Sequence, residues 1–200
     1  MLLYETEIKI RLDSEARLSS TITLCTNLYG DGENLLQVDE YFDTPEEHLK
    51  TEDLTLRLRT INGIVRVAMK SSRERITEAM HKRIELEFTA ADAREVREQI
   101  VRQGLITTAI YEKQRWRFKT DDSKIVVDRL PFIGTFVEVE AASPRRINNV
   151  LNLLRLSIND AVSDNYTELL EAKFKELGLP LRPNLRATFE AEAQWLSQQQ

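Results

Sequence analysis

Two glutamates and a lysine near the start of the chain, Glu5, Glu7 and Lys9, alternate with Thr6 and Ile8. A period of two is typical of a β-strand, so we expect a strand over residues 3–12 that carries these three charges on one face. Carboxylate oxygens suit Mg²⁺ and Mn²⁺, and an ammonium group can bind phosphate. One such strand is also typical of an ordinary solvated face, so the pattern gains weight only where it recurs.

The same alternation recurs on later segments, with bases on some and acids on others. The charged positions that share strand faces in this way are Glu5, Glu7, Lys9, Arg57, Arg59, Lys70, Arg115, Asp128, Glu138 and Glu140. An antiparallel sheet with one face in water is the simpler explanation. However, Arg57 and Arg59 would lie about 7 Å apart on one strand. Their repulsion calls for a counter-charge, either from acidic strands or from a bound polyanion.

Apolar periodicity and turn residues predict eight strands and four or five helices. The strands are expected at residues 3–12, 34–43, 54–61, 64–70, 82–89, 106–119, 123–129 and 134–141. Asn62-Gly63 predicts a tight hairpin between the third and fourth strands. The helices are expected from Ser14 to Leu28, from Asp92 to Gly104, from Ser143 to Leu154, from Asp164 to Gly178 and from about Arg186 to Ser197.

Composition narrows the classes of protein to which the chain can belong. Of its 200 residues 42% are hydrophobic, which is ample for a core, and the net charge of −5 argues against a surface that coats nucleic acid. A single cysteine, Cys25, excludes an intramolecular disulfide, and His48 and His81 lie outside any metal-ligand spacing. No apolar run near 18 residues occurs. We therefore expect a cytoplasmic protein that binds neither nucleic acid nor membrane.

Each expected strand has one apolar and one charged face. If the strands close into a barrel, the apolar faces lie outside beneath helices and the charged faces line the lumen. The expected fold is α+β: an eight-stranded antiparallel closed barrel with a charged lumen and helices packed outside. A barrel of this size has room for its side chains and one small ligand. Arginine and lysine would bind polyphosphate oxygens, and carboxylates would hold a divalent metal that bridges to the same oxygens. This combination is what phosphoryl-transfer chemistry requires.

Nine segments occur in a fixed order along residues 5–170. They are Glu5-Thr-Glu7-Ile-Lys9, Asp39-Glu-Tyr41-Phe-Asp43-Thr44, Leu56-Arg57-Leu58-Arg59, Lys70, Arg83-Ile-Glu85-Leu-Glu87, Glu112-Lys113-Gln114-Arg115, Val127-Asp128, Gly134 through Glu138-Val-Glu140, and Asn165-Tyr166-Thr-Glu-Leu169-Leu170. In this order they resemble the CYTH superfamily, also called triphosphate tunnel metalloenzymes, which includes class IV adenylyl cyclases, thiamine triphosphatases and inorganic triphosphatases. The resemblance implies a tunnel that binds a triphosphate and one or two divalent cations.

The resemblance also implies a role for each matching position. Phosphates would be bound by Lys9, Arg57, Arg59, Lys70 and Arg115, and Mg²⁺ or Mn²⁺ by Glu5, Glu7, Asp128, Glu138 and Glu140. Among these, Lys9, Lys70 and Glu138 would act in catalysis. Lys113 is expected to bind substrate as well, although for Lys113, Glu85 and Glu87 a structural salt bridge is an equal alternative.

The family contains two reactions, and the sequence contains cues to both. In the hydrolases a metal-polarised water attacks the terminal phosphoryl group, whereas in the cyclases the ribose 3′-hydroxyl of ATP attacks the α-phosphorus. The complete Glu138-x-Glu140 pair favours hydrolysis of tripolyphosphate, thiamine triphosphate or a nucleoside triphosphate. Residues 112–115 and 166–170 look closer to class IV cyclases, which convert ATP to cyclic AMP and pyrophosphate. A non-catalytic polyphosphate-binding or nucleotide-binding module is the third alternative.

The remaining expectations concern organisation and individual side chains. A tunnel domain is expected over residues 1–178, with a helical extension at 179–200 that packs on it, in a monomer or a homodimer. Cys25, Trp116 and Phe118 are expected in the apolar core outside the barrel. Tyr41 could line the lumen, and Asp39 could be a structural partner of Arg57 or Arg59.

Overall fold

The computed structural model describes residues 3–120 and 122–199, with the backbone alone for residues 3–5. The strands are β1 (Leu3–Leu12), β2 (Glu33–Asp43), β3 (Thr55–Ile61), β4 (Ile64–Lys70), β5 (Glu74–Arg75), β6 (His81–Ala90), β7 (Ile106–Lys119), β8 (Ser123–Leu130), β9 (Gly134–Ala141) and β10 (Leu185–Ala187). The helices are α1 (Glu15–Tyr29), α2 (His48–Thr51), α3 (Ala93–Arg102), α4 (Pro144–Leu153), the 3₁₀ helix η1 (Ile158–Asp160), α5 (Tyr166–Leu177) and α6 (Phe189–Ser197). Within this part of the chain, no helix is long and apolar enough to cross a bilayer.

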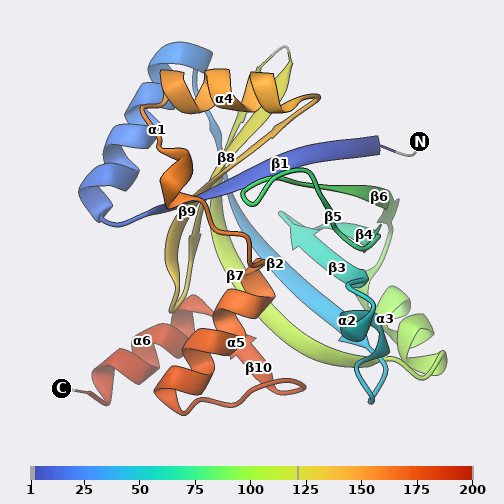
Figure 1. The fold of residues 1–200 in the computed structure, drawn as a ribbon. Coiled ribbons are helices and arrows are strands. Elements are labelled where there is room, and N and C mark those ends of the chain that lie inside the picture. The colour runs from blue at the N-terminus through green and yellow to red at the C-terminus, as the bar shows by residue number, and fades with distance from the viewer. Residues whose placement is uncertain (1–2, 121, 200) are drawn as a thin grey trace.

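Eight of the strands close into an antiparallel barrel (Figure 1). Their order around the barrel is β1-β9-β8-β7-β2-β3-β4-β6, and β6 pairs back onto β1 from Leu3↔Glu85 to Glu7↔His81. The closing contact joins the first strand to one from the middle of the chain, so closure is a tertiary property. The predicted closed barrel is confirmed.

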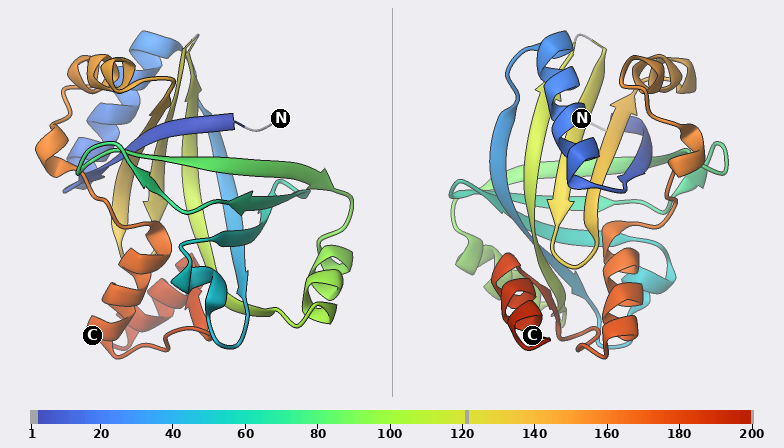
Figure 2. Two further views of the ribbon diagram at one scale, coloured as in Figure 1. Left: turned by 45° about the vertical axis from the view of Figure 1, so that its right-hand side comes forward. Right: turned by 90° about the vertical axis from the view of Figure 1, so that its left-hand side faces the viewer.

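Apolar side chains face outward from the barrel, and those of β1, β8 and β9 pack beneath α1 and α4, whereas Met69, Leu86 and Phe88 on β4 and β6 are exposed. On β9, Val137 and Val139 are fully buried against a core to which α1 contributes Leu18 and Cys25 and α4 contributes Ile147. Burial of each such side chain stabilises the fold by about 1.5–3 kcal/mol. In the two further views (Figure 2), α1 and α4 lie together on one side of the barrel, and α3 lies away from both of them. The core positions predicted for Cys25, Trp116 and Phe118 are confirmed.

The hairpin between β3 and β4 sets the register of the two strands that carry Arg57, Arg59, Arg66 and Lys70. Asn62 and Gly63 both have positive φ, 49° and 77°, as a two-residue type I′ turn requires. This turn places Arg59 opposite Arg66 and Arg57 opposite Ala68. A slip of one residue would turn the bases of the shifted strand to the outer face.

The lower end of the lumen is apolar, which the sequence did not indicate. Tyr111 and Phe136 face inward there, and α5 closes this end by packing Tyr166, Leu170 and Phe174 against them. The charged lumen is therefore confirmed for the upper part of the barrel, and α5 forms its floor. Figure 1 shows α5 and α6 together below the strands.

Two predicted helix starts need correction. The helix expected from Asp164 begins at Tyr166, because Asn165 is the cap: its side chain accepts from Glu168 N and the Glu168 side chain accepts from Asn165 N. The helix expected from about Arg186 begins at Phe189, because Leu185–Ala187 pair in parallel with β7 as β10. Residues 185–189 therefore contact the barrel directly, while the domain division at residue 178 stays a prediction.

Candidate active site

A cavity of about 300 Å³ occupies the lumen between the barrel mouth and the N-terminus of α5. Twelve lysines and arginines line it, against nine aspartates and glutamates, counted over the described residues. The chain as a whole carries a net charge of −5. The excess of positive charge is therefore local to the cavity, and such a cavity attracts anions.

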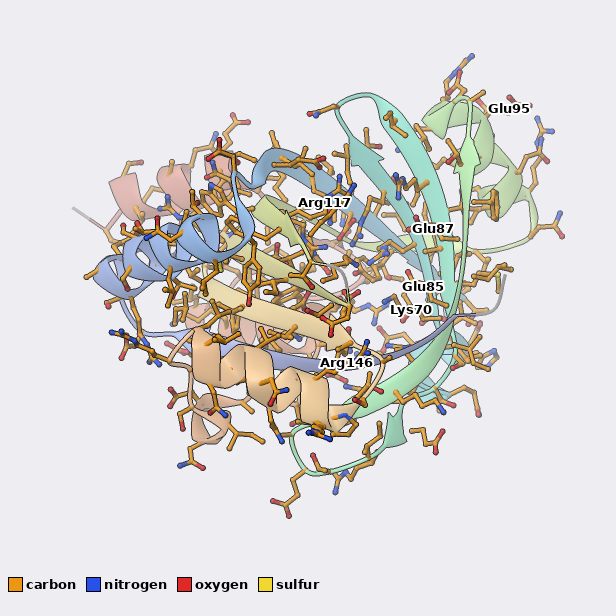
Figure 3. All side chains as sticks on the ribbon, turned by 90° about the horizontal axis from the view of Figure 1, so that it is seen from above. Lys70, Glu85, Glu87, Glu95, Arg117 and Arg146 are labelled. Atoms are coloured by element: carbon orange, nitrogen blue, oxygen red, sulfur yellow. The ribbon has the colours of Figure 1, made fainter. Side chains whose placement is uncertain are left out.

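Most of the predicted site residues meet at this cavity. Those that line it are Glu7, Lys9, Arg57, Arg59, Lys70, Lys113, Arg115, Glu138 and Glu140. The side chain of Glu5 lies outside the described residues, although its backbone pairs with Arg83 on β6. Seen from above (Figure 3), Lys70, Glu85 and Glu87 lie inside the ring of strands, whereas Glu95 lies outside on α3. Tyr41 also lines the cavity, as expected.

Glu85 bridges two bases on neighbouring strands. Its Oε2 lies 3.0 Å from Lys70 Nζ, and its Oε1 accepts from Arg57 Nη2 at 3.3 Å. Burial opposes its ionisation, but Lys70 and Arg57 together lower the pKa of Glu85 to about 2. The Glu85 carboxylate thus lies between two bases from neighbouring strands.

This low pKa predicts a pH-dependent loss of stability in the variant Glu85→Gln. The folded-state pKa of about 2 is below the ordinary 4.5, so the contribution is complete above pH 4.5 and is lost as the pH falls towards 2. We expect the variant to lose roughly 3 kcal/mol of unfolding free energy at pH 7 and little near pH 2. Urea unfolding of both proteins from pH 2 to pH 7 measures this. A constant difference at every pH would contradict it.

Asp39 and Arg59 form a buried bidentate pair. Arg59 Nε donates to Asp39 Oδ1 at 2.7 Å and Arg59 Nη2 donates to Oδ2 at 2.9 Å. Asp39 is fully buried, and although burial opposes ionisation, Arg59, Arg57 and Lys113 hold its pKa well below its usual range. Of the two partners considered for Asp39, the structure places Arg59 in direct contact.

Arg59→Ala should therefore act mainly on stability. It would leave the buried Asp39 carboxylate with Gln37 and with Lys113 Nζ, which is 3.9 Å away. We expect the free energy of unfolding to fall by about 3–5 kcal/mol, since an uncompensated buried charge remains. Arg66→Ala, which removes a more exposed pair with Glu87, should cost no more than about 1 kcal/mol in the same urea titration. Equal losses in the two variants would contradict this assignment.

A second buried cluster surrounds Asp128. Its carboxylate accepts from Arg115 Nε at 2.6 Å and from Tyr166 Oη at 3.1 Å, and Lys113 Nζ lies 3.2 Å away. Burial opposes ionisation of Asp128, but Arg115 and Lys113 keep its pKa well below its usual range. Burial and the adjacent Arg115 lower the pKa of Lys113 to about 7, against the effect of Asp128. Asp128 is fully buried, is not among the side chains that line the cavity, and already has its hydrogen-bond donors in place, while its role in metal binding stays a prediction.

The acids nearest the mouth come from β1 and β9. Glu7 is the cross-strand neighbour of Glu140, and Lys9 is the neighbour of Glu138. Lys124 Nζ lies 2.7 and 2.9 Å from the two oxygens of Glu140, while Glu138 accepts from Arg115 at 3.1 Å. Burial and Asp128 favour protonation of Glu138, yet Lys9, Arg115 and Lys113 hold its pKa below the ordinary value.

These acids are suited to a divalent cation by their chemistry. Two carboxylates that face each other across a strand pair repel. Glu7 has no ion pair within 4 Å and no hydrogen bond among the described residues, although its charge acts on the nearby Arg83. All the donors are carboxylate oxygens, which Mg²⁺ and Mn²⁺ prefer. In the described part of the chain no three acidic, histidine or cysteine side chains are grouped closely enough to hold a metal. The carboxylates are therefore chemically suitable ligands for a divalent cation. In this structure Lys124 and Arg115 occupy Glu140 and Glu138, so these bases would compete with the cation.

Several lining residues were not among the predicted site residues. Lys124 shares a strand face with Asp128, so alternation alone could have indicated it. Gln37 likewise shares a face with Asp39 but is uncharged, and a charge pattern does not reveal it. Arg182 and Lys50 reach the cavity from outside the barrel strands, and no periodic signal marks them. Arg182 is held there by Thr108 Oγ1, which accepts from Nη2 at 2.6 Å.

The fold and the cavity together define a closed antiparallel barrel with an ionic, mainly basic lumen. Residues 3–157 match the CYTH domain, and the chain belongs to this family, as the sequence motifs predicted. No curated protein sequence matches the chain.

Solved structures share this fold at low sequence identity. A candidate adenylate cyclase from Vibrio parahaemolyticus is 20% identical with a TM-score of 0.71, over 85% of this chain and 99% of that one. A candidate adenylyl cyclase from Hippeastrum, described as having a dominant triphosphatase activity, is 16% identical with a TM-score of 0.62, over 90% and 99%. The Mimivirus capping enzyme triphosphatase is 12% identical with a TM-score of 0.51, over 76% and 88%.

Proposed function

We propose that the protein is a divalent-metal-dependent enzyme that hydrolyses the terminal phosphate of a triphosphate bound in the barrel lumen. The observation that carries the proposal is the state of Arg57. Its side chain is 8% exposed and lines the cavity, yet its Nε has no hydrogen-bond partner among the described residues. Although burial opposes its charge, Asp39 and Glu85 raise the pKa of Arg57, so the guanidinium stays charged. A buried, charged and partly unpaired guanidinium is suited to phosphate oxygens.

The other bases extend this site along the lumen. Lys70 shares Glu85 with Arg57, so a phosphate that displaces Glu85 would contact both bases. On the opposite wall, Lys9 lies 3.8 Å from Glu138 and Arg115 lies 3.1 Å from it. A chain of three phosphates can therefore be bound by bases from both walls. Lys9 and Lys70 would stabilise the charge that develops on the phosphoryl oxygens during reaction.

The metal would be held by Glu7 and Glu140, with Glu138 and Glu5 on the same strand faces. When bound, a divalent cation lowers the pKa of water and polarises phosphoryl oxygens. Lys124 would have to release Glu140 for this role, and phosphate groups offer Lys124 an alternative partner. Asp128 would act indirectly, because it holds Arg115 and Lys113 in the cavity wall.

The decisive assay uses pure protein with ATP, thiamine triphosphate and tripolyphosphate, each with Mg²⁺ and with Mn²⁺. Release of inorganic phosphate supports the proposed hydrolase. Formation of cyclic AMP and pyrophosphate from ATP would instead identify a class IV adenylyl cyclase; two of the solved structures that share the fold are named as candidate adenylyl cyclases. Tight binding without turnover, equal with and without metal, would identify a nucleotide-binding or polyphosphate-binding module.

A further inference from the structure

Gln37 carries a buried, unpaired acceptor in the wall of the cavity. The residue lies on β2, is fully buried and lines the cavity. Its Nε2 donates to Asp39 Oδ2 at 3.0 Å, whereas its Oε1 has no hydrogen-bond partner in the described part of the chain. Because Asp39 is ionised and can only accept, the amide cannot be turned the other way without bringing two acceptors together. The carbonyl oxygen of Gln37 is therefore the free end.

No neighbouring base is placed to satisfy this oxygen. Lys113 is the cross-strand neighbour of Gln37 on β7, but its Nζ is directed to Asp128 at 3.2 Å and to Asp39 at 3.9 Å. Arg59 uses Nε and Nη2 on Asp39. A buried carbonyl without a donor costs about 1–3 kcal/mol, so such atoms are rare unless a ligand or water supplies the bond.

Two aliphatic side chains lie next to Gln37 on one side, while Lys113 is its neighbour on the other side. Ile61 on β3 lies directly across from Gln37, and Leu35 lies two residues along β2 on the same face. Both line the cavity. A phosphate gains nothing from isoleucine and leucine, and at neutral pH its oxygens accept rather than donate. An unpaired amide acceptor beside two aliphatic side chains suits an organic group that carries a hydroxyl or an amine.

We infer that Gln37, Leu35 and Ile61 form the subsite for the organic part of the substrate, and that this part donates a hydrogen bond to Gln37 Oε1. The inference rests on the proposed function and narrows its substrate class to organic triphosphates, as opposed to inorganic tripolyphosphate. Gln37 is two residues, about 7 Å, from Asp39, which holds Arg59. The organic group would therefore continue directly from the phosphates.

The test compares Gln37→Met with Gln114→Met, and uses ATP and tripolyphosphate as probes with Mn²⁺. Methionine keeps the length of the side chain and removes the amide. Gln114 is a matched control on the neighbouring strand β7, where its side chain bonds to Asn34 on the outer face. We expect Gln37→Met to lower kcat/KM and affinity for ATP about tenfold and to leave both values for tripolyphosphate within about twofold. Gln114→Met should leave kcat/KM and affinity unchanged for both probes.

Three outcomes would overturn the inference. Equal losses for ATP and tripolyphosphate would mean that Gln37 supports the phosphate site or the fold. Unchanged kinetics with both probes would mean that water satisfies Oε1. If the unmodified protein had a higher kcat/KM and affinity for tripolyphosphate than for ATP, the organic group would not be recognised. If neither probe binds to the unmodified protein, the proposed function itself fails, which calorimetric titration of each probe distinguishes from the first three results.

Discussion

Arg57→Ala is expected to lower the affinity for tripolyphosphate about 100-fold while changing the free energy of unfolding by only about 1 kcal/mol. Hydrogen bonds to charged groups contribute about 1.5–3 kcal/mol each, and Arg57 offers a partly unpaired fork to the ligand. Its protein partner Glu85 would keep Lys70 at 3.0 Å, so no carboxylate is left without a base. Removal of a like charge next to Lys70 and Arg59 also relieves repulsion.

Two measurements check this result. Calorimetric titration with tripolyphosphate gives the affinity, and urea unfolding without ligand gives the stability. Arg57→Lys keeps the charge but loses the planar fork, so its affinity for tripolyphosphate should lie between those of the unmodified protein and Arg57→Ala. Arg94→Ala removes an exposed guanidinium on α3 and should change neither quantity. If Arg57→Ala bound tripolyphosphate as tightly as the unmodified protein, the proposed phosphate site would be wrong.

The contrast with Arg59 is part of the same expectation. The two arginines are separated by one residue and share a strand face, and sequence alone gives them the same role. The structure gives Arg59 a complete bidentate partner in Asp39 and leaves Arg57 with one longer contact at 3.3 Å. Arg59→Ala should therefore reveal itself first as a loss of stability and Arg57→Ala as a loss of binding.

Glu138→Gln together with Glu140→Gln should abolish the response of turnover to Mg²⁺ and Mn²⁺. Loss of residues that only support metal ligands costs about 10–100-fold, so removal of two ligands should lower the metal-dependent rate more than about 100-fold. The same change removes two negative charges from a basic cavity. Binding of tripolyphosphate in the presence of EDTA should therefore be retained or strengthened.

Steady-state phosphate release with increasing Mn²⁺, and titration with tripolyphosphate in EDTA, separate the two effects. Glu98→Gln is the control, because Glu98 lies exposed on α3 between Arg94 and Arg102. It should leave both measurements unchanged. Undiminished metal-dependent turnover in the double variant would refute the metal assignment, and a parallel loss of metal-free binding would point to a damaged barrel.

Local periodicity predicted much of this protein. Residues 134–141 alternate valines with Glu138 and Glu140, and a strand must place such alternating side chains on opposite faces. The sequence of the hairpin determined its register as well, because Asn62 and Gly63 readily adopt positive φ. These signals are local, so they were sufficient to predict the eight barrel strands and their apolar and charged faces. The ordered motifs, which are also read directly from the sequence, were sufficient to indicate the family.

Only the tertiary structure decided which charges pair inside the barrel. Arg59 reaches Asp39, Arg115 reaches Asp128, and Arg57 is left with free hydrogen-bonding capacity. These partners depend on which strands lie side by side and in which register they pair, and no periodicity within one strand encodes that pairing. The apolar floor formed by α5 and the unpaired oxygen of Gln37 arise in the same way, since segments far apart in the chain create both.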